Sequence, residues 1–224
     1  MVIVEKVISE EHIRNFYRLS GSLICELSFH NFKDDYFLND KFITNFINGN
    51  IRSESDFMIW DYRYDKMSPD TPVDEKTELE IRKSPEFKQY VIDRLRNSLS
   101  EFKNEISNYI NPVTNKIKIY RAIDVDDNWI EHLSSQGKHL GIYWSWDPQG
   151  GVAYGGQDKG NDAYITSEIN EKYVDWGETF MANMLLSTER EITLFKNTPL
   201  KIYGIELNNK NINIDLLKNK IFFS

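Results

Sequence analysis

Cysteine is nearly absent from this chain of 224 residues, and the single copy, Cys25, excludes an internal disulfide. The lack of disulfides fits a reducing compartment. No window approaches the roughly 18 consecutive apolar residues that a membrane-spanning helix needs. Residues 1–6 also lack the apolar core of a signal peptide. We therefore expect a cytoplasmic protein with no membrane segment, and leave delivery into another cell open.

An excess of positive charge is also missing, since 27 Lys and Arg face 35 Asp and Glu, for a net charge of -8. This balance argues against general affinity for nucleic-acid backbones, although a local basic groove stays possible. The chain has neither the G-x-G-x-x-G nor the G-K-[ST] phosphate-binding signature, and no H-E-x-x-H metal motif. With four scattered histidines, it shows no Ser-His-Asp order. We expect no metal site.

Aromatic residues are plentiful: 13 Phe, 12 Tyr and 5 Trp supply a sizeable core. The length suits one large domain, or a small domain with a helical lobe. A dense aromatic run covers residues 57–64. It is typical of a core strand or packing segment, and the alternative is an aromatic surface for a partner.

The first half of the chain has the periodicity of helices. Apolar residues recur at three- and four-residue steps in 10–30, and 40–47 is a second short segment that Gly49 would end. The strongest pattern begins at Ser84 as N-cap, with Pro85 in the first turn. Its apolar stripe continues to residue 110 and stops before Pro112, because the residue before a proline avoids the helical region.

The second half alternates as strands do. We predict strands near 117–123, 141–146, 162–169, 191–195 and 201–207, a short helix at 127–133, and a last strand or helix within 212–223. Segment 179–187 is either an apolar loop or a short core helix. Helices followed by strands indicate an α+β fold. We divide it into a helical N-terminal lobe, 1–112, and a β core, 113–224, packed as one unit.

Two carboxylates open one of these strands. Glu189 and Glu191 are two residues apart, so an extended chain would point both to one face. Like charges held that close raise each other's proton affinity unless a cation or a substrate lies between them. A solvated strand end is the alternative interpretation.

Three short motifs occur in order, each on a predicted strand: Y-R-A at 120–122, Y-W-S-W at 143–146 and E-R-E at 189–191. This order resembles the arginine–serine–glutamate class of mono-ADP-ribosyltransferases, which includes bacterial toxins and phage enzymes. The resemblance covers roughly residues 117–207. It implies a split, mostly antiparallel β-sheet with NAD bound as co-substrate in the cleft between its halves.

The resemblance also implies residue roles. Arg121 would hold the pyrophosphate of NAD, because a guanidinium makes bidentate, charge-assisted bonds; an ordinary ion-pairing arginine is the alternative. The backbone of Ala122 would pair with the nicotinamide amide. Glu191 would bind the ribose 2′-hydroxyl and stabilise the positive charge of an oxocarbenium-like transition state. Ser145 would hold Glu191 in place, and Glu189 would orient or deprotonate the acceptor.

Aromatic residues around these motifs are candidates for the nicotinamide pocket. Tyr120, Tyr143 and Trp144 flank the arginine and the serine, and Tyr154 follows on a predicted helix. Some of these rings would instead be core.

Together these features predict transfer of ADP-ribose from NAD to a protein, with arginine as the expected acceptor. An NAD glycohydrolase and a transferase to another acceptor, including a nucleobase, are alternatives. A non-catalytic interaction module is a third.

Overall fold

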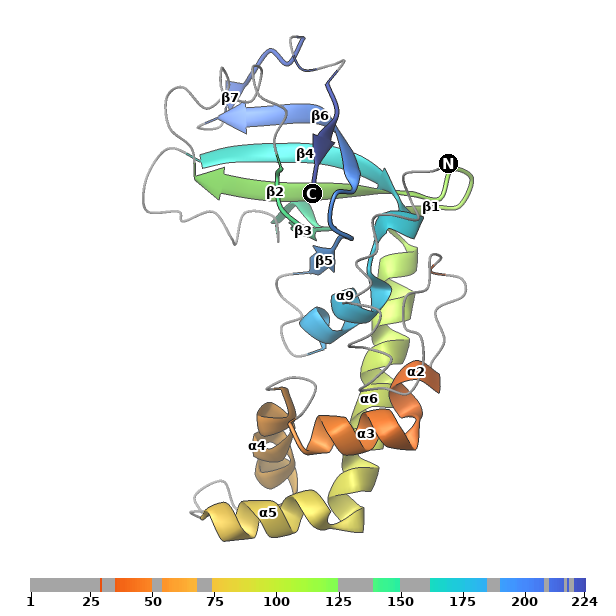
Figure 1. The fold of residues 1–224 in the computed structure, drawn as a ribbon, viewed down its shortest axis with the longest axis vertical. Helices are drawn as coiled ribbons and strands as arrows, with labels where there is room; N and C mark the ends of the chain where they lie inside the picture. The colour runs from red at the N-terminus through yellow and green to blue at the C-terminus, as the bar shows by residue number, and fades with distance from the viewer. Residues whose placement is uncertain are drawn as a thin grey trace. The chain divides into compact units, whose positions relative to one another are not determined.

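The computed structural model describes residues 29, 35–49, 54–67, 74–124, 139–149, 162–184, 190–207, 210–215, 217 and 220–224. The fold is α+β, as the sequence predicts: helices dominate the first half and an open antiparallel sheet the second (Figure 1). The chain divides into two compact units. Among the described residues, 35–102 form the helical unit, and Phe29 with 103–224 forms the sheet unit.

The helical unit contains α2 (Asp35–Leu38), α3 (Asp40–Ile47), α4 (Glu54–Lys66), α5 (Glu75–Lys83) and most of α6 (Pro85–Ser107). Helix α3 has the predicted bounds, and its N-cap Asn39 accepts a 2.9 Å hydrogen bond from Phe42 N. Helix α5 was not predicted, because a single apolar residue, Ile81, is buried along it.

Helix α6 confirms the strongest sequence pattern. The N-cap is Ser84, whose hydroxyl accepts a 3.1 Å bond from Phe87 N. Every residue of the predicted stripe is at most 8% exposed: Phe87, Val91, Leu95, Leu99, Phe102, Ile106 and Ile110. The helix nevertheless ends at Ser107, before the predicted stop, because Ile110 and Asn111 form β1 and pair with the next strand.

The aromatic run at 57–64 lies in helix α4, so its interpretation as a strand is wrong. Met58 and Ile59 are buried, whereas Trp60 and Tyr64 are exposed and stack with ring centroids 5.6 Å apart. Aromatic residues favour strands only where a pleated surface supports them. Here Tyr62 of α4 packs edge-on against the ring of Phe87 on α6, so the aromatic residue has a packing partner within a helix.

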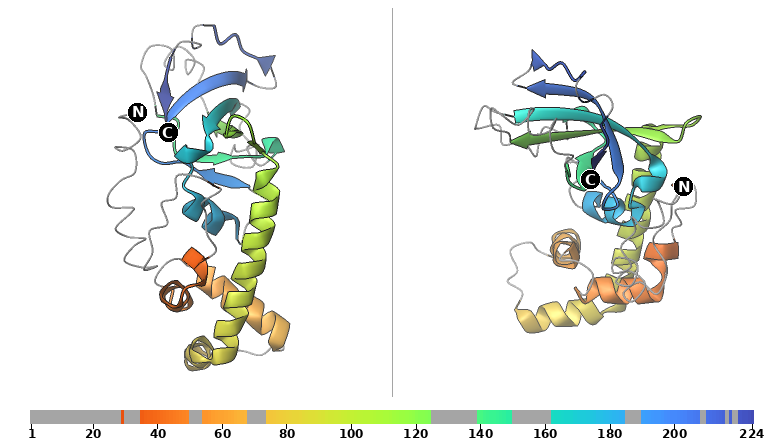
Figure 2. Two further views of the ribbon diagram at one scale, coloured as in Figure 1. Left: turned by 90° about the vertical axis from the view of Figure 1, so that its right-hand side faces the viewer. Right: turned by 45° about the horizontal axis from the view of Figure 1, so that its top comes forward.

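The sheet unit is built on β1 (Ile110–Asn111), β2 (Lys116–Asp124), β3 (Tyr143–Ser145), β4 (Asp162–Asn170), β5 (Glu191–Thr193), β6 (Pro199–Leu207), β7 (Lys210–Asn211) and β8 (Phe222–Phe223). The principal strand order is β5-β3-β2-β4-β6-β7, and β1 and β8 pair with β2 and β6. Strands β2 and β4 pair over nine residues and lie side by side in every view (Figure 2). The predicted strands are confirmed, and β1 and β7 are additions.

One face of the sheet is the core. Strand alternation brings together side chains that are at most 3% exposed: Ile117, Ile119, Trp144, Ala163, Ile165, Ile169, Ile192, Ile202 and Ile205. Segment 179–187 is helical where it is described, because α9 (Trp176–Asn183) buries Phe180 and Met181 completely. The predictions for 10–30, 127–133, Glu189 and Tyr154 lie outside the described residues, apart from Phe29.

Candidate functional site

The serine motif is central to the candidate site. Strand β3 lies between β2 and β5, and Ser145 pairs with Tyr120 on one side and Glu191 on the other. Residues directly opposite in antiparallel strands share a face, with Cβ atoms roughly 4.5–5.5 Å apart. The row Glu191–Ser145–Tyr120 therefore joins members of all three motifs on the face opposite the apolar core.

Tyrosine rings cover the same face. Tyr120 and Tyr164 stack with centroids 5.9 Å apart, and the hydroxyl of Tyr164 donates a 2.7 Å bond to Pro148 O. Burial raises the pKa of both hydroxyls above the ordinary tyrosine value. Tyr143 is 52% exposed and pairs with Thr193. This face offers aromatic surface next to a carboxylate.

Arg121 lies on the other face. Since side chains alternate along β2, Arg121 is in line with Ile165, on the apolar side of the sheet, whereas Tyr120 is in line with Ser145. Its guanidinium lies at the edge of this side, where Nη1 donates a 2.7 Å bond to Tyr143 O of β3. Arg121 and Glu191 therefore do not point to the same face.

The junction between β2 and β3 is narrow. Within the described residues, the two strands share one registered pair, Tyr120–Ser145, whereas β3 and β5 share three pairs. The guanidinium of Arg121 lies beside this junction and against Gly141, whose φ is +85°. A Cβ on Gly141 would lie 2.5 Å from Nη1, so a glycine is needed both for the backbone conformation and for the close approach.

Helix α9 holds the edge strand β5. Asn183 Nδ2 donates a 2.6 Å bond to Glu191 O, and Thr179 Oγ1 accepts a 3.0 Å bond from Thr193 N. These bonds satisfy backbone groups on an edge that would otherwise be open to pairing. Thr193 Oγ1 also donates to the carboxylate Oε1 of Glu191 over 3.3 Å. Both the main chain and the side chain of Glu191 are thus held.

Ser145 is fully buried and closes the turn that follows β3. Its Oγ donates a 2.9 Å bond to Asp147 O and accepts a 3.1 Å bond from Asp147 N. The Asp147 carboxylate accepts a 2.7 Å hydrogen bond from Gln149 N. The expected bond between Ser145 and Glu191 stays a prediction.

The sequence did not single out Arg190, the middle residue of E-R-E. It has a φ of +47°, and its guanidinium contacts the carboxylates of Asp147 and Glu105. Burial alone lowers the pKa of Arg190, but the hydrogen bond to Asp147 and the charges of Glu105 and Asp147 outweigh it, so the pKa is raised. A signal was present: an arginine beside Glu191 with an acidic residue two positions after Ser145.

Two further predicted site residues are buried. Trp144 is 1% exposed, and its indole N–H donates a 2.9 Å bond to Gly141 O. Its ring belongs to the core and not to the candidate site. Ala122 is 7% exposed on the tyrosine-covered face, and its predicted backbone role stays a prediction.

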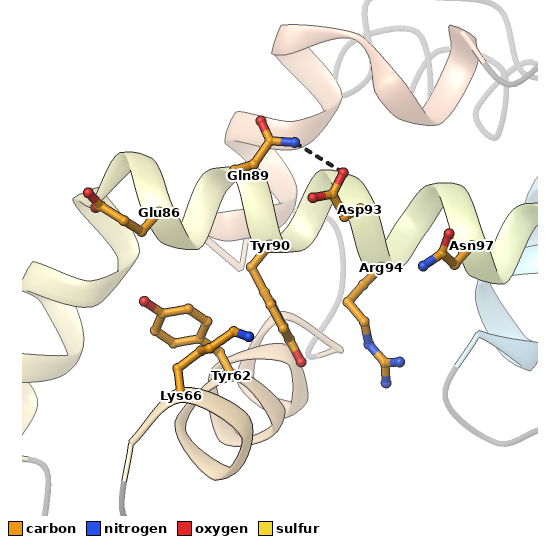
Figure 3. A pocket seen from close by; sticks show the side chains of 8 residues that line it. All are labelled: Tyr62, Lys66, Glu86, Gln89, Tyr90, Asp93, Arg94 and Asn97. Carbon is orange, nitrogen blue, oxygen red and sulfur yellow. Dashed lines mark hydrogen bonds between the residues drawn. The ribbon is translucent and has the colours of Figure 1, made fainter.

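The helical unit has a cavity of about 540 Å³ between α4 and α6 (Figure 3). Its lining carries both charge signs: Tyr62, Lys66, Glu86, Gln89, Tyr90, Asp93, Arg94 and Asn97. Tyr90 and Arg94 both bind the Asp61 carboxylate, at 2.7 and 2.8 Å. The mixture of charges defines no ligand class.

Neither a family profile, nor a curated protein, nor a solved structure matches this chain. Among the described residues, no helix has the length and apolar character needed to cross a bilayer. The same residues contain no group of three or more His, Cys, Asp or Glu side chains able to hold a metal ion.

Proposed function

We propose that this protein is a mono-ADP-ribosyltransferase that moves ADP-ribose from NAD to a protein side chain, with arginine as the expected acceptor, and releases nicotinamide. The observation that carries the proposal is the row Glu191–Ser145–Tyr120 across three neighbouring strands. Residues from the three motifs, far apart in the sequence, lie there on neighbouring strands, with Tyr120 rather than Arg121 on the face of Ser145 and Glu191.

The residues of this row suit the chemistry. Breaking the bond between ribose and nicotinamide develops positive charge on the ribose, and a fixed carboxylate stabilises that charge. Glu191 is half-buried and held by Thr193 and Asn183. A carboxylate already in place needs little reorganisation during the reaction, which is the condition for effective electrostatic stabilisation.

The position of Arg121 sets a condition on how NAD would bind. The guanidinium is at the β2–β3 junction, half-buried, with Nη1 on the Tyr143 carbonyl. A guanidinium has five N–H donors and is suited to a pyrophosphate. Because Arg121 and Glu191 belong to opposite faces, NAD would have to reach around the end of the short β2–β3 pairing, with the phosphates near Arg121 and the ribose near Glu191.

Arg121→Ala is expected to weaken NAD binding roughly 10- to 100-fold, since hydrogen bonds to a charged group contribute about 1.5–3 kcal/mol. Arg121→Lys should recover little, because a point charge does not reproduce the planar fork. Isothermal titration calorimetry with NAD measures both. Equal affinity in the wild type and both variants would remove Arg121 from the site.

Gly141→Ala tests the position of the Arg121 guanidinium without changing Arg121 itself. Its Cβ would displace the guanidinium without removing it. NAD affinity should fall while Arg121 stays present. Thermal unfolding is recorded alongside, because a φ of +85° is strained for alanine.

Ser145→Ala is expected to lower the rate of nicotinamide release by about tenfold, in line with the loss of one or two hydrogen bonds. As a positioning residue, Ser145 should affect kcat more than it affects NAD affinity. The fall in kcat should be smaller than the fall that loss of Glu191 causes. Ser167→Ala is the matched control, since Ser167 is also fully buried in the sheet and donates a 2.8 Å bond to Lys201 O. A covalent serine adduct in the wild type would show a different mechanism.

A non-catalytic interaction module is the second candidate, and one observation favours it. Trp60 and Tyr64 are 55% and 63% exposed and stack on each other along α4. Exposed aromatic residues are enriched at protein interfaces. Calorimetry with NAD separates the two candidates, because an interaction module has no reason to bind the dinucleotide.

A further inference from the structure

The residue between the two glutamates has a role of its own. We propose that Arg190 is a positioning residue, which joins the turn after β3 to the start of β5 and thereby sets Glu191 relative to Ser145. The catalytic part of this inference rests on the proposed function. The structural part, that Arg190 fixes Glu191, stands independently.

Arg190 connects three segments of the sheet unit. Its Nε lies 2.9 Å from Oε1 of Glu105 on α6, and its Nη1 contacts Oδ2 of Asp147 after β3. Its backbone carbonyl accepts a 3.1 Å bond from Trp146 N. One residue is thus tied through its side chain and its main chain to the segment that carries Ser145.

The backbone of Arg190 explains why these contacts affect Glu191. A φ of +47° is uncommon for a residue with a side chain, and it persists where surrounding contacts support it. This conformation directs the chain into β5, whose first residue is Glu191. Without the two carboxylate contacts, the chain before Glu191 could relax toward more common conformations.

The turn on the other side depends on the same contact. Asp147 binds Arg190 with one carboxylate oxygen and Gln149 N with the other, and its main-chain O and N each form a hydrogen bond with the Ser145 hydroxyl. A movement of Asp147 would therefore move Ser145. Arg190 controls both members of the Ser145–Glu191 pair.

Arg190→Gln removes both ion pairs and keeps most of the side-chain length. We expect kcat for nicotinamide release to fall roughly 10- to 100-fold, because small misplacements of a catalytic group have effects of that order. The NAD dissociation constant should change by less than about threefold, since Arg190 touches neither phosphate nor base in this proposal. If Arg190 had a purely structural role, Arg190→Gln would lower the melting temperature but would not lower kcat selectively over NAD affinity.

Two variants sharpen the assignment. Arg190→Lys should recover part of the rate, because an ammonium can contact one carboxylate but cannot bridge two as a guanidinium does. Arg190→Gln combined with Asp147→Asn should be no slower than the worse single variant, because both substitutions remove the same contact between Arg190 and Asp147. Multiplicative losses would show that the two residues act separately and would overturn the proposal.

Arg82→Gln is the matched control. Arg82 of the helical unit also contacts two carboxylates, Asp56 at 2.5 Å and Glu78 at 2.9 Å. Its loss should leave nicotinamide release within about twofold of the wild type, because, among the described residues, Arg82 contacts none of Asp147, Ser145 and Glu191. An equal loss in Arg82→Gln and Arg190→Gln would reduce Arg190 to a general stability role.

Hydrogen–deuterium exchange separates failure of this inference from failure of the proposed function. If the wild type neither binds NAD nor releases nicotinamide, the enzyme proposal is wrong. Peptides covering 191–195 should still exchange faster in Arg190→Gln than in the wild type and in Arg82→Gln. Unchanged exchange in that segment would overturn the positioning role whatever the activity.

Discussion

Glu191→Gln is expected to lower nicotinamide release by roughly 100- to 1,000-fold, the effect of removing one preorganised stabilising group from a transition state. The amide keeps the shape of the side chain and loses its negative charge. Ionisation of the bond between ribose and nicotinamide is common to transfer and to hydrolysis, so both products should decline together. Nicotinamide release and incorporation of labelled ADP-ribose into lysate proteins measure the two.

Glu189→Gln should behave differently. The motif resemblance implies that Glu189 orients or deprotonates the acceptor. A charged guanidinium is a poor nucleophile, so an arginine acceptor needs a nearby carboxylate more than a water acceptor does. Transfer to protein should be lost while much of the slow NAD hydrolysis remains. Mass spectrometry of the modified proteins identifies the acceptor residue.

Glu206→Gln is the control for both variants. Glu206 is an exposed carboxylate on the same face of the sheet, on β6, and pairs with Tyr164 of β4. Both activities should stay near the wild-type level. If the two E-x-E variants lose both activities equally, the division of roles is wrong; if neither changes anything, E-x-E is a solvated strand end.

Trp144→Ala is expected to lower the free energy of unfolding by about 3–5 kcal/mol, the usual range for removing a large aromatic ring from a core. The ring is 1% exposed, lies on the same face as Ile192, and donates to Gly141 O. Its loss leaves a cavity beside β3 and an unpaired carbonyl. Denaturant unfolding followed by fluorescence measures the change.

Tyr143→Ala is the neighbouring control, on the opposite face of the same strand. Since Tyr143 is 52% exposed, its loss should change the free energy of unfolding by less than about 0.5 kcal/mol. The proposed site predicts a separate effect, weaker NAD binding, because this ring borders Thr193 and the β2–β3 junction. A large stability loss in Tyr143→Ala with none in Trp144→Ala would contradict the assignment of the two faces.

Local sequence patterns were enough to predict many of the helices and strands. The α6 stripe was predictable because side chains three and four residues apart share one side of any helix, whatever the helix packs against. The strands were predictable for the same reason, since alternation at 117–123 already separates a core face from an open face. The interpretation of 57–64 as a core strand was wrong because aromatic composition is compatible with both periods. The alternative of a packing segment fits the buried Met58 and Ile59 and the contact of Tyr62 with Phe87.

The sequence by itself determined the α+β class, the stripe of α6, the main strands and the residue types of the three motifs. Only the tertiary structure decided that β3 pairs with both β2 and β5, which sets Ser145 between Tyr120 and Glu191. The same pairing puts Arg121 on the other face and brings Arg190 to Asp147 and Glu105. Periodicity is a local property of the backbone, whereas strand neighbours and ion pairs between distant residues depend on how the whole chain buries its apolar face.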